Sequence, residues 1–532
     1  MKQTSPQRIY VYDAVLRDGA QGEGVNFSCT DKLLITRKLD ALGVDYIEGG
    51  WPGSNPKDIE FFQRIKGEKL RHAKIAAFGS TRHARHAAEE DENLRLLIEA
   101  ETPVVTIFGK SWLLHVREAL RVDSETNLAM VADSVAYLKE HGRETIFDAE
   151  HFFDGYLDDP VYAMAVLEAA VEAGADCLTL CDTNGGCIPD TIHEIVSAVY
   201  AKFPAVQIGF HGHNDSGCGV ANSLAAVAAG AAHVQGTING IGERCGNADL
   251  TGVVPGLMLK MGCTTDVTLD RLTEVSRYVD EIANIPHNKR QAYTGASAFA
   301  HKGGIHVSAI QRNERTYEHI KPGQVGNTRR ILVSELSGKS NVIFKAKELG
   351  IDIGQNGTEL QDVVEEVKLR EHLGYEYEAA DASLELLVQR SRGMFTPSFE
   401  ILGFRVIDEE RNGAIVSEAT VKVRVEGKEE HTAAEGDGPV HALDSALRKA
   451  LRPFYPILEE ISLIDYKVRV LTIKEFSGTA SKVRVLIEST DGQDVWGTVG
   501  VSTNIIEASY EAIIDSVEYK LMKAKGDAAR KE

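Results

Sequence analysis

Eight short β-rich runs alternate with helical stretches through the first half of the chain, and this alternation restricts the possible folds more than any other feature. The β-rich runs are residues 8–16, 44–50, 74–80, 103–109, 145–151, 176–181, 206–213 and 233–240. A strand followed by a helix, repeated eight times, predicts a parallel (β/α)8 TIM barrel in the α/β class. A doubly wound sheet is the alternative, but it usually has fewer strands and a phosphate-binding loop after the first, and no such loop is visible.

Glycines mark the ends of several helical stretches in this region. They lie between a helical stretch and the following β-rich run, at Gly43, Gly142, Gly174 and Gly230. A helix often ends in a residue with left-handed backbone conformation, which glycine adopts without steric cost. We therefore expect all four to have a positive φ angle.

Two different regions follow the predicted barrel. Residues 266–380 are more polar and helical, and predict linker subdomains that complete an active site. Residues 381–525 hold β-rich runs at 398–408, 419–426, 464–471, 481–489 and 494–501, with helical stretches at 440–451 and 507–522. A β-rich group that ends in a helix occurs twice, which indicates an internal duplication. We predict a barrel over 1–265, helical linkers over 266–380 and a duplicated α+β regulatory domain over 381–525.

The charge and cysteine content narrow the classes of partner. Lysine and arginine number 58 against 79 aspartate and glutamate, a net charge of −21 that repels nucleic acid and anionic lipid. The seven cysteines are an odd number, which indicates reduced thiols and a cytoplasmic location. No run of about 18 apolar residues occurs, so we expect no membrane span. The negative net charge leads us to expect no nucleic-acid partner.

The strongest chemical signal is a pair of histidines at the end of the seventh run. His211 and His213 lie two residues apart, so both rings point to the same face of a strand. With a rise of about 3.3 Å per residue, both rings can reach one divalent ion at the barrel mouth. A pair of hydrogen-bonded core histidines is the alternative. Asp18, after the first run, would complete a two-histidine, one-carboxylate metal site, although it could equally form an Asx turn.

Other polar residues follow the same or neighbouring runs, and each has an ordinary structural alternative. Arg17 could direct positive charge toward the mouth or form a structural ion pair, and Asn247 could add an amide oxygen or begin a helix. Glu150 could act as an acid or base, and Thr179 could donate to a substrate carboxylate. His306 and Tyr317 lie outside the predicted barrel and could join the site only if the linker reaches a barrel mouth; otherwise they pack.

These residues occur in an ordered set of motifs that resembles one enzyme family. The set comprises LRDG at 16–19, HGHND at 211–215, NGIGERCGNADL at 239–250 and GGIH at 303–306, followed by the duplicated C-terminal region. In this order they resemble the metal-dependent acyl-CoA Claisen synthases, which include 2-isopropylmalate, homocitrate and citramalate synthases. Ala20 stands where 2-isopropylmalate synthases typically carry glutamate, and with LCDTNGG at 180–186 it makes the chain most similar to a bacterial citramalate synthase branch.

The resemblance implies a role for each of the candidate residues. It implies a divalent metal ion (Zn, Mn or Mg) bound by Asp18, His211 and His213, with Asn247 close by. Arg17 would stabilise an enolate and the oxygen that becomes an alkoxide, and Thr179 would hold the carboxylate of a 2-oxo acid. Glu150 and His306 would form an acid/base pair, with Tyr317 as a further catalytic residue.

The resemblance also implies substrates, an effector and an assembly. The expected reaction condenses acetyl-CoA with pyruvate and water to citramalate and CoA, in a threonine-independent route to isoleucine. The nearest alternative is 2-isopropylmalate synthesis from 2-oxoisovalerate; a metal-dependent aldolase or lyase, and a non-catalytic metal- or amino-acid-binding protein, are more distant. The C-terminal region resembles a dimeric domain that senses an amino acid, here isoleucine, in a homodimer. The turn at Gly436, Asp437 and Gly438 offers backbone amides for a carboxylate, or is a simple helix entry.

Overall fold

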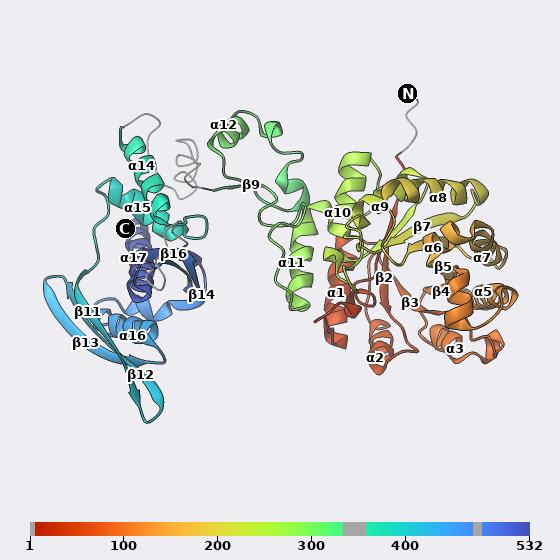
Figure 1. Ribbon diagram of the computed structural model, residues 1–532, viewed down its shortest axis with the longest axis horizontal. Helices are drawn as coiled ribbons and strands as arrows, with labels where there is room; N and C mark the ends of the chain where they lie inside the picture. The colour runs from red at the N-terminus through yellow and green to blue at the C-terminus, as the bar shows by residue number, and fades with distance from the viewer. Residues whose placement is uncertain (1–5, 333–357, 472–480, 532) are drawn as a thin grey trace. The chain divides into compact units, whose positions relative to one another are not determined.

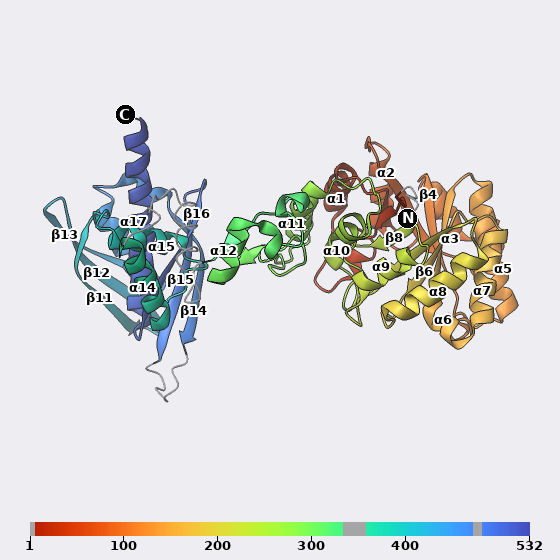
Figure 2. The same cartoon turned by 90° about the horizontal axis from the view of Figure 1, so that it is seen from above.

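The computed structural model describes residues 6–332, 358–471 and 481–531 (Figures 1 and 2). The chain divides into two compact units. The first comprises Met1–Phe299 with Ile320–Thr328, and the second comprises Ala300–His319 with Arg329–Glu532. The region expected to form linkers, 266–380, therefore contributes segments to both units. No helix within the described ranges is both long enough and apolar enough to cross a bilayer.

The first unit is an eight-stranded parallel barrel, which confirms the predicted fold class and excludes a doubly wound sheet. Its strands are β1 (Tyr10–Asp13), β2 (Tyr46–Gly50), β3 (Lys74–Ser80), β4 (Val104–Lys110), β5 (Glu144–Glu150), β6 (Cys177–Asp182), β7 (Gln207–Gly212) and β8 (His233–Gly236). They lie in sequence order, and β8 pairs in parallel with β1 to close the barrel. Each of the eight predicted runs overlaps one of these strands.

Helices between the strands cover the outside of the barrel (Figure 1). The longer ones are α1 (Cys29–Leu42), α2 (Pro56–Ile65), α3 (Glu92–Glu99), α5 (Ser124–Glu140), α7 (Pro160–Glu172), α8 (Pro189–Lys202) and α9 (Gly219–Ala228). α10 (Leu250–Pro255) follows β8, and α11 (Leu272–Ile282) packs against α1. The main hydrophobic core fills the space between helices and strands, and a smaller cluster around Tyr12, Ala76 and Ile146 fills the barrel interior.

The four glycines predicted at helix ends all have positive φ, of 96°, 72°, 95° and 118° in chain order. Gly43 has a second constraint, because a Cβ atom there would lie 2.2 Å from the carbonyl oxygen of Asp266. Gly142 has the same backbone geometry but no atom within 4 Å of the added Cβ position. At Gly43, close packing therefore adds to the conformational reason for glycine.

The second unit contains a duplicated fold of three antiparallel strands followed by a helix. The first copy consists of β11 (Glu400–Arg411), β12 (Ala414–Val425), β13 (Lys428–Gly436) and α16 (Pro439–Leu451). The second consists of β14 (Ser462–Leu471), β15 (Lys482–Thr490), β16 (Val495–Ser502) and α17 (Ile505–Lys531). The predicted duplication is confirmed, but β13 was not predicted. Its sequence begins Lys-Glu-Glu-His and its side chains are exposed or half-buried, so it lacks the apolar signal of a strand.

A short strand pair and further helices precede the duplicated fold in the second unit. They are the strand pair β9 (Ala300–His301) and β10 (Arg330–Ile331), with α12 (Gly304–Arg312), α14 (Thr358–Leu373) and α15 (Asp381–Ser391). α15 packs against α17 and β16, so this helix belongs to the core of the duplicated fold. The glycine cluster at 303–304 begins α12, with Gly303 as its N-terminal cap.

The two glycines test how much of the barrel stability depends on close packing at a helix end. We expect Gly142→Ala to lower the free energy of unfolding by about 1 kcal/mol, because alanine resists positive φ. Gly43→Ala adds overpacking against Asp266 and should cost roughly 2–3 kcal/mol. Urea unfolding followed by circular dichroism measures both. Equal losses in the two variants would show that the contact with Asp266 relaxes without cost.

Candidate metal centre and active site

The carboxyl ends of all eight strands meet at one mouth of the barrel, and the candidate residues follow from that geometry. After β1 the chain turns tightly, because the backbone amides of Asp18 and Gly19 both donate to the carbonyl oxygen of Ala14, at 2.9 and 3.1 Å. His211 lies near the end of β7, and His213 follows that strand in an isolated bridge with Asn247. β1 and β7 both adjoin β8, so these segments converge at the mouth.

The structure brings Asp18, His211 and His213 together as one buried cluster. Oδ2 of Asp18 lies 3.4 Å from Nε2 of His211 and 3.9 Å from Nε2 of His213, and the two Nε2 atoms are 3.3 Å apart. Ligand bonds of about 2.0–2.2 Å place neighbouring ligand atoms about 3.0–3.6 Å apart around one ion. The separations of 3.4 and 3.3 Å lie in this range, and that of 3.9 Å lies slightly beyond it. One carboxylate oxygen and two imidazole nitrogens so arranged are a possible ligand set for a divalent metal ion.

The protonation states of the cluster depend on its burial and on neighbouring charges. Burial alone would raise the pKa of Asp18, but the charge of Arg17 and the hydrogen bond from His211 hold it well below its usual range. Burial works against a charged His211, yet the adjacent Asp18 carboxylate raises the pKa of this histidine. Burial and the neighbouring His211 lower the pKa of His213 to about 4. His213 is therefore neutral near pH 7, the form that binds a metal ion.

Asn247 lies beside this cluster with one oxygen unused. Its Nδ2 donates to the carbonyl oxygen of Ile241 at 3.3 Å, whereas its buried Oδ1 has no hydrogen-bond partner among the described residues. Buried amide oxygens are rarely left without a partner. This oxygen therefore suits a metal ion or a water molecule bound to one.

Arg17 is fixed at the mouth by three contacts. Its Nε and Nη2 atoms donate to the fully buried carboxylate of Glu48 over 2.9–3.2 Å. Its Cζ lies 3.7 Å from the centre of the Phe78 ring, and its Nη1 lies 3.7 Å from Oδ2 of Asp18. Glu48 was not among the residues predicted from the sequence, although a carboxylate two residues before the end of β2 has the same inward position as the candidates on other strands.

Thr179 lies below the mouth, in a polar layer that sequence reasoning missed. Its side chain is fully buried, and its hydroxyl is 3.2 Å from Nε2 of Gln235. The same Nε2 donates to Asp148 at 3.0 Å, and Oε1 of Gln235 lies 3.0 Å from Nδ1 of His211. The available signal was the period of two, which places Asp148 on the same face of β5 as Glu150.

Two other polar side chains do reach the mouth from β5 and β6. Glu150 ends β5 and forms an ion pair with Lys110 at the end of β4, with both side chains partly exposed. Thr183 follows β6 and is half-buried; its hydroxyl accepts a hydrogen bond from the backbone amide of His151 at 2.9 Å. Arg244 donates to the carbonyl oxygen of Thr183 at 2.7 Å, which ties the loops after β6 and β8 together.

His306 and Tyr317 belong to the second unit, whereas the other candidate site residues of the barrel belong to the first. Their rings stack with centres 4.1 Å apart at an angle of 29°. Both side chains are exposed, His306 on α12 and Tyr317 just after it. The structure thus brings these two candidates together as a pair on one surface.

A second group of possible metal ligands contains Asp45, His72 and Asp266. A cation already occupies this place, because Arg8 donates to both carboxylates and lies 2.7 Å from Asp266. Asp266 is also half exposed. This group is therefore a surface ion-pair network around an arginine.

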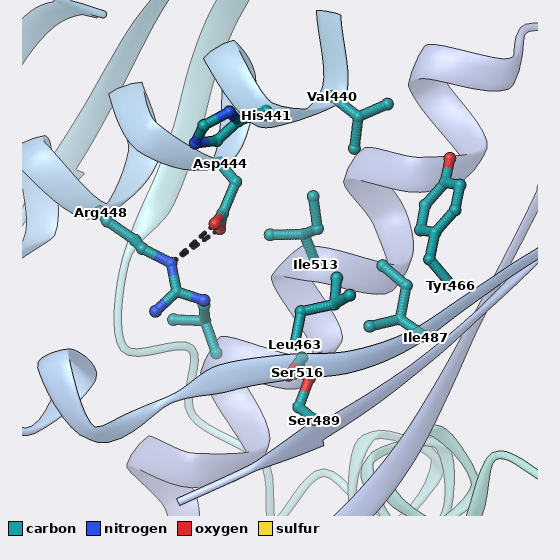
Figure 3. A pocket seen from close by; sticks show the side chains of 11 residues that line it. Val440, His441, Asp444, Arg448, Leu463, Tyr466, Ile487, Ser489, Ile513 and Ser516 are labelled. Carbon is teal, nitrogen blue, oxygen red and sulfur yellow. Dashed lines mark hydrogen bonds and ion pairs between the residues drawn. The ribbon is translucent and has the colours of Figure 1, made fainter. Parts of the chain in front are cut away.

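The second unit contains a cavity of about 370 Å³ between the two copies of the duplicated fold (Figure 3). Asp444 and Arg448 of α16 are joined at 2.8 Å on one side of it. Apolar side chains from the second copy line the other side, among them Leu463, Ile487 and Ile513. The cavity therefore offers both charges and an apolar surface to a small ligand.

The predicted effector turn lies at the start of α16, beside this cavity. Gly436 must be glycine, because a Cβ atom would lie 2.4 Å from the amide nitrogen of Ala442. The amide of Asp437 donates to the His441 ring at 3.1 Å, and Gly438 caps the helix. His441 in turn lines the cavity.

Three protein families match successive parts of the chain. The HMGL-like family matches residues 8–279, which is the barrel with α11. The homocitrate synthase post-HMGL domain-like family matches 293–372, and the LeuA allosteric (dimerisation) domain matches 378–521.

Similar proteins cover almost the full length. The (R)-citramalate synthase of Geobacter sulfurreducens is 56% identical over 97% of this chain and 98% of its own. That of Aquifex aeolicus is 54% identical over the same shares. The 2-isopropylmalate synthase of Methanocaldococcus jannaschii is 32% identical over 97% of this chain and 96% of its own. The chain belongs to the citramalate synthase family. As a member of this family it is an acyltransferase, and the similarity predicted from the motif order is confirmed.

Substitutions of Asp18 and His72 test which of the two groups of possible metal ligands binds an ion. We expect Asp18→Asn to weaken the binding of Mn²⁺ to metal-free enzyme by at least ~10-fold, because a neutral amide replaces the anionic ligand. His72→Ala should bind Mn²⁺ as the unmodified protein does, because Arg8 occupies the second group. Calorimetric titration measures both. If only His72→Ala lost Mn²⁺ binding, the ion would bind at the group that contains His72, which would contradict this interpretation.

Proposed function

We propose that this enzyme condenses acetyl-CoA with pyruvate and water to give citramalate and free CoA, the entry to a threonine-independent isoleucine route. The observation that carries the proposal is the buried cluster of Asp18, His211 and His213 beside Arg17 at the barrel mouth. Five named (R)-citramalate synthases at 47–56% identity support pyruvate as the acceptor, whereas the 2-isopropylmalate synthases are more distant.

The ligand set suits a divalent ion such as Zn²⁺, Mn²⁺ or Mg²⁺. Asp18, His211 and His213 would hold it, with the free oxygen of Asn247 beside them. A metal ion bound there supplies a Lewis acid that makes the keto carbon of a 2-oxo acid more electrophilic. The protein itself excludes bulk water, since all four of these side chains are at least nine-tenths buried.

Arg17 provides the positive charge that the nucleophile requires. Deprotonation of the acetyl methyl group gives an enolate, which is stabilised by fixed hydrogen-bond donors in a low-dielectric site. The bonds to Glu48 use Nε and Nη2, so the Nη1 edge of the guanidinium faces the cluster. Glu48 thus keeps the donors of Arg17 in position before the substrate binds.

A hydroxyl from β6 holds the carboxylate of the 2-oxo acid in this proposal. The motif resemblance assigns that contact to Thr179, whose hydroxyl is fully buried and bonded to Gln235. Thr183 lies four residues further along, at the mouth, with a half-buried hydroxyl. We therefore assign the carboxylate contact to Thr183 and a supporting role to Thr179.

Glu150 and His306 are the proposed acid/base pair. Glu150 lies at the mouth, where its carboxylate forms an ion pair with Lys110. His306 is exposed and stacks on Tyr317, and the stacking fixes the orientation of its ring. The same pair would assist water in hydrolysing the citramalyl thioester, the step that makes the reaction effectively irreversible.

Aromatic side chains beside Arg17 favour a small acceptor. The rings of Phe78 and Phe108 stack with centres 5.5 Å apart, and Trp51 packs edge-on against both, at 6.0 and 5.7 Å. Phe78 and Phe108 occupy inward positions of β3 and β4 near the mouth. Such rigid rings leave less room for the isopropyl group of 2-oxoisovalerate than for the methyl group of pyruvate.

The condensation is tested with purified enzyme, acetyl-CoA, Mn²⁺ and either 2-oxo acid, while a thiol reagent detects free CoA. We expect CoA release with pyruvate and a kcat/KM at least ~10-fold higher for pyruvate than for 2-oxoisovalerate. Removal of the metal with a chelator should abolish the release. Absence of CoA release with pyruvate would contradict the proposal, and a preference for 2-oxoisovalerate would make the enzyme a 2-isopropylmalate synthase.

The cavity in the second unit is the proposed effector site, in a cytoplasmic homodimer regulated by isoleucine. Asp444 can accept hydrogen bonds from an ammonium group, and Leu463, Ile487 and Ile513 can contact a branched side chain. The turn at Gly436–Gly438 lies next to this cavity, so its amides can meet the carboxylate of the same amino acid. The match to an allosteric dimerisation domain supports this part of the proposal.

Asp444 provides the test of the effector site. We expect Asp444→Asn to weaken isoleucine binding by ~10-fold or more, because a hydrogen bond to a charged group contributes about 1.5–3 kcal/mol. Glu459→Gln is the matched control, since Glu459 pairs with Arg452 outside the cavity. Calorimetry with isoleucine and leucine measures both. Equal isoleucine binding by the two variants would show that the effector binds elsewhere.

A further inference from the structure

Gln235 connects the candidate metal cluster to the polar layer below it. The residue lies on β8 and is fully buried. Its side-chain amide makes three contacts at once: Oε1 with Nδ1 of His211 at 3.0 Å, and Nε2 with Asp148 at 3.0 Å and Thr179 at 3.2 Å. None of the sequence motifs contains this glutamine.

The neighbours of Gln235 permit only one orientation of its amide group. Asp148 accepts hydrogen bonds from Nε2 of Gln235 and from the Thr179 hydroxyl. Burial raises its pKa to about 6, and above that pH the group is mainly a carboxylate, which only accepts hydrogen bonds. The Nε2 group must therefore face Asp148, because the reverse orientation would place two oxygens against each other. The second N–H of Nε2 is used by the Thr179 hydroxyl, which itself bonds to Asp148.

This orientation has a consequence for His211. With Nε2 committed to Asp148 and Thr179, the side-chain oxygen of Gln235 must point to Nδ1 of His211. That oxygen can only accept, so Nδ1 carries a proton and Nε2 keeps its lone pair when the ring is neutral. Nε2 is the atom that faces Asp18 and His213.

We infer that Gln235 is a positioning residue that fixes His211 in the tautomer and ring orientation needed to bind the metal ion, with Asp148 and Thr179 holding the glutamine in place. The inference rests on the proposed metal role of His211. Outer hydrogen bonds of this kind typically change metal affinity by about 10–100-fold when they are removed.

The experiment compares Mn²⁺ binding to metal-free, full-length variants by calorimetry. Gln235→Met keeps the length of the side chain but offers His211 no acceptor, and should weaken binding by ~10–100-fold. Gln235→Glu combined with Asp148→Asn restores an acceptor for the Nδ1 proton without placing two carboxylates together, because the asparagine amide can donate to the new carboxylate, and should recover most of that loss. Gln207→Met, at the start of neighbouring β7, removes a half-buried glutamine away from the cluster and should bind Mn²⁺ within about twofold of the unmodified enzyme.

Two further measurements separate positioning from packing. The visible absorption spectrum of bound Co²⁺ reports the ligand geometry and should change in Gln235→Met but not in Gln207→Met. Asp148→Asn conserves size, but asparagine donates as well as accepts hydrogen bonds, so the amide of Gln235 is no longer held in one orientation and Mn²⁺ binding should weaken. Circular dichroism confirms that each variant is folded.

The outcomes distinguish this inference from the proposed function. If the unmodified enzyme and Gln235→Met bind Mn²⁺ equally tightly, the role of Gln235 is overturned and the proposed metal site stands. Equal weakening in Gln235→Met and in the double variant Gln235→Glu/Asp148→Asn would also overturn it, because the acceptor would then be irrelevant. Unmodified enzyme that binds no Mn²⁺ would instead overturn the proposed metal site, and with it the purpose assigned to Gln235.

Discussion

The buried carboxylate of Asp18 is the constraint around which the barrel mouth is organised. A charged group at 3% exposure is stable only beside compensating charge and hydrogen bonds. Arg17 and His211 supply that compensation, and Arg17 is itself balanced by the fully buried Glu48. The charges therefore form a chain from Glu48 to His213, and moving any one of them leaves another buried without a partner.

Local signals were sufficient to predict the barrel and the candidate metal cluster at its mouth. Each strand is a short apolar run, and Gly43 or Gly142 marks a helix end through its own backbone geometry. Once the barrel is accepted, parallel strand ends must meet, so Asp18 and His211 come together although they lie far apart in the sequence. The convergence of these side chains follows from the topology, which explains why the sequence could indicate it.

The residues missed by sequence reading depend on depth within the barrel, which periodicity does not give. Thr179 lies within β6 and Thr183 follows that strand, so the Thr179 hydroxyl is buried in a hydrogen-bond network whereas Thr183 lies at the mouth. Gln235 has no motif around it, and its importance comes from three partners on three other strands. The cavity in the second unit could not be predicted either, because its lining comes from both copies of the duplicated fold.

The polar layer beneath the mouth lowers the stability of the barrel but orients the His211 ring. Barrel interiors are usually filled by branched apolar side chains, whereas here one layer contains Asp148, Thr179 and Gln235. Such groups cost stability unless every donor and acceptor is used, and in this layer the amide of Gln235 is used at both ends. A fully apolar layer would make the barrel more stable but would leave the His211 ring free to choose its tautomer. We therefore interpret the layer as stability given up for a defined orientation of one ligand.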